Sequence, residues 1–205
     1  MLRALAPRMM PAAGAAPLRL ALAALATVGP AGGCVADHER PAASVDSQAG
    51  LPPWEGRARE VFDDNIEPAA VGFSLDGPSP RSDPFLRERA QTGDVVARVR
   101  VNTVTVDSIG EQSTYHLGIQ VGYPPLATPR APDRAFELHI RPQSRAFGVA
   151  KAIDARLRGL TFIAFIRRFA GEAGEPEIHW HLSPDTAEVA AAVKEAVVLG
   201  ELSAP

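Results

Sequence analysis

Alternating apolar and polar residues in the middle of the chain constrain its fold more than any other feature of the sequence. Valine or alanine occupies every second position from Val95 to Val101, and arginine or asparagine follows each of the last three. This period of two predicts a β-strand with one buried face. The apolar positions then move one residue out of phase, to Val104 and Val106. Because a strand exchanges its faces only at a bulge or sharp coil, we expect a bulge near Asn102–Thr103.

Four further segments carry strand patterns, and two carry helix patterns. The strands are predicted over residues 115–121, 136–140, 160–166 and 178–182. The segment 160–166 is apolar on both faces, which predicts a central strand covered by a helix. Residues 142–159 place apolar side chains on one helical stripe, and a closing helix is predicted after Pro184.

This order of elements predicts a mainly β domain of the α+β class. Three strands, a helix, two strands and a final helix resemble the OB-fold, a five-stranded Greek-key barrel. The resemblance covers about residues 93–182 and implies a small five-stranded OB-like barrel, with a helix between strands three and four and a C-terminal helix. A simple α+β sheet packed against two helices is the alternative.

The N-terminal residues have the pattern of an export signal. Three arginines, Arg3, Arg8 and Arg19, precede the apolar stretch 20–28, which is too short to span a bilayer of about 30 Å. Ala31-Gly32-Gly33-Cys34 follows and contains the chain's single cysteine. Residues 1–33 are therefore predicted to be a signal peptide.

The sequence around Cys34 resembles the lipobox of bacterial lipoprotein precursors. The resemblance implies that Cys34 becomes the first residue of the mature chain, with diacylglycerol on its sulfur and an acyl group on its amine. Acyl chains of this kind hold a protein on a membrane without a spanning helix. Val35, where an aspartate would favour the inner membrane, implies the cell envelope at the periplasmic face of the outer membrane or the cell surface.

The domain organisation predicted after the signal peptide has two parts. Residues 34–87 are rich in proline and alanine and are predicted to form a flexible tether with short ordered pieces. Within this tether, residues 54–62 predict a short helix. Asp63 and Asp64 lack the spacing of a calcium-binding loop, so a solvated turn is expected there. Residues 88–202 are predicted to be the globular domain.

Charge and motifs limit the partners and the chemistry. The whole chain has a net charge of -3, and removal of residues 1–33 leaves 18 basic and 24 acidic residues. An acidic domain is the wrong sign for nucleic acid, so the expected partners are the membrane, through the lipid anchor, and an envelope protein or polymer. The sequence contains no nucleophile elbow, phosphate-binding loop or zinc-protease motif, and it predicts no catalytic residues and no cofactor.

The histidines are the one group of residues in the sequence that indicates a ligand-binding site. The candidates are the histidines at polar positions of predicted strands: His116, His139, His179 and His181. Two histidines at i and i+2 share one strand face, a spacing that zinc and iron sites use, and Glu137 or Glu177 could complete a set. The alternative is that these polar positions simply face water, in which case no metal is bound.

Three functions therefore stay open from the sequence alone. The first is a non-catalytic, lipid-anchored envelope protein that binds a partner or polymer. The second is a metal- or ligand-binding lipoprotein that uses the histidine-bearing strand face. The third is an envelope hydrolase that uses carboxylates such as Asp154, Glu137 or Glu177.

Overall fold

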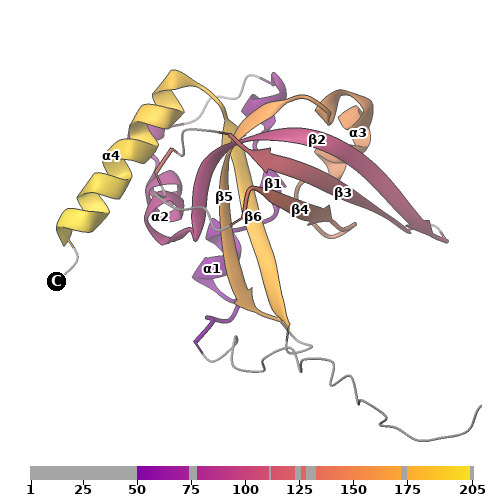
Figure 1. The fold of residues 1–205 in the computed structure, drawn as a ribbon, viewed down its shortest axis with the longest axis horizontal. Helices are drawn as coiled ribbons and strands as arrows, with labels where there is room; N and C mark the ends of the chain where they lie inside the picture. Colours follow the sequence, from indigo (N-terminus) through magenta and orange to yellow (C-terminus); the bar gives the residue numbers. More distant parts are fainter. Residues whose placement is uncertain are drawn as a thin grey trace, which may run out of the picture. The chain divides into compact units, whose positions relative to one another are not determined.

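A curled sheet of six strands, in the order β1-β6-β5-β2-β3-β4, organises the fold (Figure 1). A computed structural model describes residues 50–73, 78–110, 112–122, 126–127, 133–171 and 175–203. The strands are β1 (Asn65–Ile66), β2 (Val95–Ile109), β3 (Gln112–Val121), β4 (Ala135–Ile140), β5 (Thr161–Ala170) and β6 (Pro176–Pro184). The helices are α1 (Arg57–Val61), α2 (Pro84–Thr92), α3 (Phe147–Leu157) and α4 (Ala187–Ser203), with short 3-10 turns at Pro68–Val71 and Pro80–Ser82. The predicted α+β, mainly β class is confirmed.

The long strand β2 is the centre of the sheet and carries the predicted bulge. Its first half pairs with β5 in antiparallel register, and it pairs with β3 along most of its length. The register with β3 shifts between Val101 and Thr103, which leaves Asn102 as the extra residue. The Asn102 side chain donates a hydrogen bond to Gln120 on β3 at 2.8 Å. The change of phase in the sequence therefore marks a bulge, as predicted.

Apolar side chains cover both faces of the sheet at β5, as the apolar run 160–166 predicts. On one face, alternate residues of all the long strands pack with α3 around Phe162, Leu117 and Trp180. On the other face, Ile163 and Phe165 pack with residues of α1, α2 and α4. Figure 1 shows α2 and α4 side by side at one end of the sheet, and α3 over the other. The second apolar layer does not extend over β3 and β4, so among the described residues the polar face of these two strands is left open.

Strand β1 adds a sixth strand to the predicted five. It is parallel to β6, with Asn65 paired to His181 and Ile66 to Leu182, and the Ile66 side chain is fully buried. Two residues are too few to show a period of two, so the sequence carries no strand signal at this position. The predicted count of five strands is therefore one short.

The predicted boundary between tether and domain at residue 88 is wrong. The described residues from 50 onward belong to one compact unit, and Val61, Phe62 and Leu86 are buried in its second apolar layer. The Arg89 side chain, itself buried, donates a hydrogen bond to the Val61 carbonyl at 2.7 Å and so joins α2 to α1. The helix predicted within residues 54–62 is present as α1. The many prolines and short elements of this segment concealed the fact that it contributes to the core.

The predicted signal peptide 1–33, Cys34 and the first part of the tether lie outside the described residues. Among the residues that the structure does describe, no helix combines the length and apolar character needed to cross a membrane.

Candidate functional site

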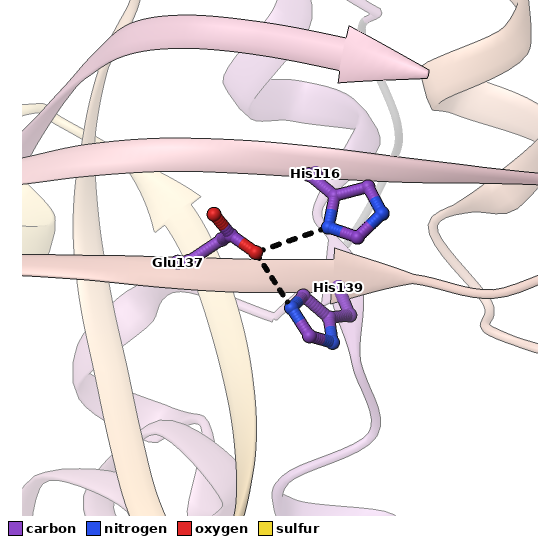
Figure 2. Close-up of side chains that lie close together, drawn as sticks. All are labelled: His116, Glu137 and His139. Carbon is purple, nitrogen blue, oxygen red and sulfur yellow. Dashed lines mark hydrogen bonds and ion pairs between the residues drawn. The ribbon is translucent and has the colours of Figure 1, made fainter. Parts of the chain in front are cut away.

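Two of the four candidate histidines converge with a glutamate on the open face of β3 and β4. His116 on β3 lies directly opposite His139 on β4, and Glu137 lies two residues before His139 on the same strand face. Figure 2 shows the three side chains pointing towards one another from the two neighbouring strands. Glu137 Oε1 lies 3.0 Å from His116 Nδ1 and 2.9 Å from His139 Nε2. The two imidazole rings meet edge to face, with their centroids 4.7 Å apart.

The electrostatics of this cluster centre on Glu137. Hydrogen bonds from His116 and His139 favour its charged form and hold the pKa of the Glu137 carboxyl below its usual value. On the far side of the His116 ring, Nε2 lies 3.1 Å from the Asp107 carboxylate on β2. Carboxylates therefore lie beside both ring nitrogens of His116, Glu137 at Nδ1 and Asp107 at Nε2.

The other two candidate histidines do not join this cluster, and they do not face water. His179 and His181 on β6 are 2% and 4% exposed. His179 Nδ1 lies 2.9 Å from the Asp64 carboxylate, and His181 Nδ1 lies 2.8 Å from that of Asp63. The expectation that polar positions on β6 face solvent is therefore wrong, and so is the solvated turn expected at the two aspartates.

Residues 53–64 explain the difference between the two histidine pairs. All four histidines alternate with residues of the first apolar layer, so all lie on the opposite face of the sheet. At β6 this face is covered by the chain from Pro53 onward, where the Trp54 ring stacks on the His179 ring with centroids 3.5 Å apart. At β3 and β4 no described segment covers the histidines in this way.

Hydrogen bonds of Asp64 hold the covering segment, residues 53–64, against the sheet. Its carboxylate accepts hydrogen bonds from the His179 ring and the Trp180 amide, and its own amide donates to the Trp180 carbonyl. Its carbonyl also accepts from the amide of Ala146, just before α3. Asp64 has a φ of 48°, in the left-handed region that few residues other than glycine adopt. These four bonds hold the residue in a costly backbone conformation.

Burial is the main cause of the pKa shifts of Asp64 and His181. It raises the pKa of the Asp64 carboxyl, against the opposing effect of the bond from His179. It lowers the pKa of the His181 ring, because desolvation outweighs the bond to Asp63. Within the described residues, the Nε2 atoms of both buried histidines have no hydrogen-bond partner. Each buried ring thus meets its aspartate through Nδ1.

An open cleft of about 1200 Å³ lies between the end of β4, the turn before α3, the start of β6 and residues 53–64. Its wall includes both the exposed Glu137–His139 edge and the buried Asp64–His179 pair. The charged, histidine and aromatic lining residues are Trp54, Glu55, Arg59, Asp63, Asp64, Glu137, His139, Arg141, Arg145, Glu175, Glu177 and His179. Two of the lining residues, Arg141 directly after β4 and Glu177 on β6, form an ion pair of 2.8 Å. Side chains of positive and of negative charge thus line one concave surface.

Sequence reasoning did not place Asp107, Asp63 or Asp64 at a site. The pairing of neighbouring strands could have indicated Asp107 and the convergence of His116, Glu137 and His139. If β3 and β4 are taken as neighbouring antiparallel strands, His116 and His139 can be placed opposite each other, with Glu137 on the same face. Asp107 would follow from the pairing of β2 and β3. No local pattern links Asp63 and Asp64 to histidines more than a hundred residues away.

Comparison with protein families, curated proteins and solved structures found no match to this chain.

Proposed function

We propose that this chain is a lipid-anchored lipoprotein of the cell envelope, and that its domain binds an envelope protein or polymer in the cleft without catalysis. The anchor rests on the apolar stretch 20–28, the small residues before Cys34 and the single cysteine. An acyl-modified Cys34 would place the domain at a membrane surface, at the outer membrane or the cell surface.

The cleft is the observation that supports binding. Ligand sites in proteins are concave and combine a few convergent polar groups with a preformed wall. Here the wall is preformed, because Asp63 and Asp64 bond to buried histidines and the Trp54 ring is stacked on one of them. The exposed side chain of Gln143 lines the same concave surface and can meet a large partner. Arg145, which is also exposed there, lies 3.3 Å from the Asp63 carboxylate.

The order of the long strands supports an OB-like barrel as the scaffold. These strands follow the order β4-β3-β2-β5-β6, with α3 inserted between β4 and β5. OB-folds bind oligonucleotides and oligosaccharides. The acidic charge of the chain beyond residue 33 opposes a nucleic acid and leaves a protein or a glycan polymer as the partner.

The carboxylates of the cleft favour binding over hydrolysis. A glycosidase or similar hydrolase needs two free carboxylates beside the scissile bond. Six carboxylates line this cleft, and four of them are already engaged. Asp63 and Asp64 accept bonds from buried histidines, Glu137 lies in hydrogen-bond contact with His116 and His139, and Glu177 pairs with Arg141. Asp154 lies on α3 and does not line the cleft.

The anchor is tested by metabolic labelling with a fatty-acid probe and by membrane fractionation in a bacterial host. We expect the wild-type chain to take up the label and to sediment with membranes, and Cys34→Ser to do neither. Wild-type protein that is unlabelled and soluble would refute the lipoprotein proposal.

The binding cleft is tested by photo-crosslinking in the same host. A photoreactive amino acid at Gln143, which is exposed in the cleft, should yield a crosslinked product. The matched control is Lys194, which is exposed on α4 and outside the cleft. Equal crosslinking at the two positions, or none at Gln143, would contradict a binding role for the cleft.

The convergence of His116, Glu137 and His139 favours a second candidate function, metal binding.

A further inference from the structure

Three donor atoms on the open face of β3 and β4 have the spacing of a metal site. His116 Nδ1, Glu137 Oε1 and His139 Nε2 all lie within 4.8 Å of one another. Metal–ligand bonds of about 2.0–2.2 Å require neighbouring donor atoms to lie about 2.8–3.6 Å apart, depending on the angle between them. The two distances from Glu137 Oε1, 3.0 Å and 2.9 Å, fall in this range. Two of the three donor spacings therefore already suit a metal ion, and the two histidine nitrogens lie within 4.8 Å of each other.

The strands hold these donors in place. The His116 and His139 backbones are register partners in antiparallel pairing, and Glu137 is fixed two residues from His139. Large buried side chains alternate with the ligands: Leu117 beside His116, and Leu138 between Glu137 and His139. A change in the position of any ligand backbone would disturb this packing, so the strands are a rigid support for a site.

Asp107 on the neighbouring strand β2 contacts the outer nitrogen of His116. Metal-binding histidines almost always donate their other ring N–H to a carboxylate, carbonyl or water, which fixes the tautomer and the ring orientation. His116 Nε2 lies 3.1 Å from Asp107 Oδ2, while Nδ1 faces Glu137. The Nε2 atom of His116, which faces away from the three donor atoms, is thus already paired with a carboxylate. A metal-binding histidine needs such a partner, whereas an isolated exposed histidine does not.

We propose that His116 Nδ1, His139 Nε2 and Glu137 Oε1 bind one divalent first-row transition metal ion, with Asp107 orienting His116 as a positioning residue. Two imidazoles and one carboxylate suit zinc, iron, nickel or copper, whereas magnesium and calcium prefer oxygen ligands alone. The three ligands leave at least one coordination position open. This site rests on the second candidate function, metal binding, and specifies its ligands and ion class; it depends neither on the lipid anchor nor on a partner in the cleft.

The location of the site connects it to the cleft. Glu137 and His139 form part of the cleft wall, and their side chains are 61% and 46% exposed. An ion bound by them faces solvent at the rim of the cleft, where its open position is within reach of a donor group on a bound molecule. The metal is therefore an additional contact for a ligand that carries a carboxylate, phosphate or imidazole.

Zinc is the probe for the experiment, with the full-length chain purified in detergent with a tag that contains no histidine. After removal of metals with a chelator, the protein is titrated with zinc chloride against a chromophoric indicator, and bound zinc is measured after gel filtration. We expect about one zinc ion per chain. Titration with cobalt in place of zinc gives a second readout, since its visible absorption changes when imidazole and carboxylate replace water.

Single substitutions separate this site from adventitious binding. His139→Ala, His116→Ala and Glu137→Ala should each abolish stoichiometric zinc binding, while Asp107→Asn should weaken it about 10–100-fold. The matched control is His38→Ala, which removes a histidine from the predicted tether. Thermal unfolding checks that the variants fold, and the exposed His139 is the variant expected to leave the Tm unchanged.

The outcomes that overturn the proposal are equally specific. Wild-type protein that retains no zinc after gel filtration, or a His139→Ala protein that binds zinc as the wild type does, would refute the site. Loss of binding in His38→Ala would assign the metal to the tether instead. Unchanged affinity in Asp107→Asn would refute the role given to Asp107.

Discussion

Removal of residues 42–87 tests the fold directly, because the sequence pattern and the tertiary structure make opposite predictions for it. The sequence predicts that a chain of residues 88–205 folds alone, since the tether would contribute nothing to the core. In the structure, the removed segment contributes four large buried side chains, Val61, Phe62, Ile66 and Leu86. It also supplies strand β1 and both aspartates that pair with buried histidines.

The magnitude follows from this burial. Each large apolar side chain contributes about 1.5–3 kcal/mol when fully buried, so the four together contribute roughly 6–12 kcal/mol. The net stability of a folded domain is only about 5–15 kcal/mol. Removal of the aspartates also leaves the His179 and His181 rings without their Nδ1 partners. We therefore expect residues 88–205 to lack a cooperative fold.

The assay is urea unfolding followed by circular dichroism, with residues 42–205 as the reference chain. The longer chain should unfold in one cooperative transition, and the shorter chain should show no transition or a broad one with exposed apolar surface. If residues 88–205 unfold cooperatively at the same urea midpoint as the longer chain, the reasoning is refuted.

A pair of phenylalanine variants tests the same point without truncation. Phe62→Ala in the longer chain should cost about 3–5 kcal/mol, because the ring is 1% exposed in the second apolar layer. Phe73→Ala is the matched control, because this ring is 54% exposed, and a change within about 0.5 kcal/mol is expected there. Equal effects of the two substitutions in urea unfolding would show that α1 does not pack as described.

Three further predictions concern the first apolar layer and the buried polar pairs. Trp180→Ala should lower the free energy of unfolding by about 3–5 kcal/mol in urea titrations, since the ring is 1% exposed; a change within error would place this ring outside the core. Asp64→Ala leaves the His179 ring and the Trp180 amide unpaired and should cost about 2–6 kcal/mol, at about 1–3 kcal/mol for each unpaired group; an unaltered thermal midpoint would contradict this. Burial lowers the pKa of His181 in the folded state, so unfolded chains take up a proton at this residue as pH falls below about 6.5 and stability declines there. The NMR signals of the folded His181 ring should accordingly not shift between pH 7 and 5.5, and titration near the ordinary pKa would refute its burial.

The elements predicted best from the sequence are those with a long local pattern. A strand places successive side chains on opposite faces, and this period of two predicted three features. They are the alternation in β2, its bulge at Asn102, and strand β5 with apolar side chains on both faces. Helix α3 could be placed because its apolar stripe has helical spacing. Strand β1 could not be placed, because two residues are too few to show a period and its partner strand β6 lies more than a hundred residues later in the chain.

The histidines show the limit most clearly. From the sequence, His116, His139, His179 and His181 are equivalent, since each alternates with apolar residues on a strand. The structure separates them: His116 and His139 meet Glu137 on an open face, and the other two are buried against Asp63 and Asp64.

Sequence by itself determined which side of β2, β3, β4 and β6 faces the first apolar layer, because that alternation is a local property of neighbouring residues. Only the tertiary structure decided which part of the opposite face is covered. At β6, the chain around Trp54 and Asp64 lies against the sheet, and Asp64 is bonded there to groups 115 and 116 residues away. Such a contact depends on the path of the whole chain, so no local pattern encodes it.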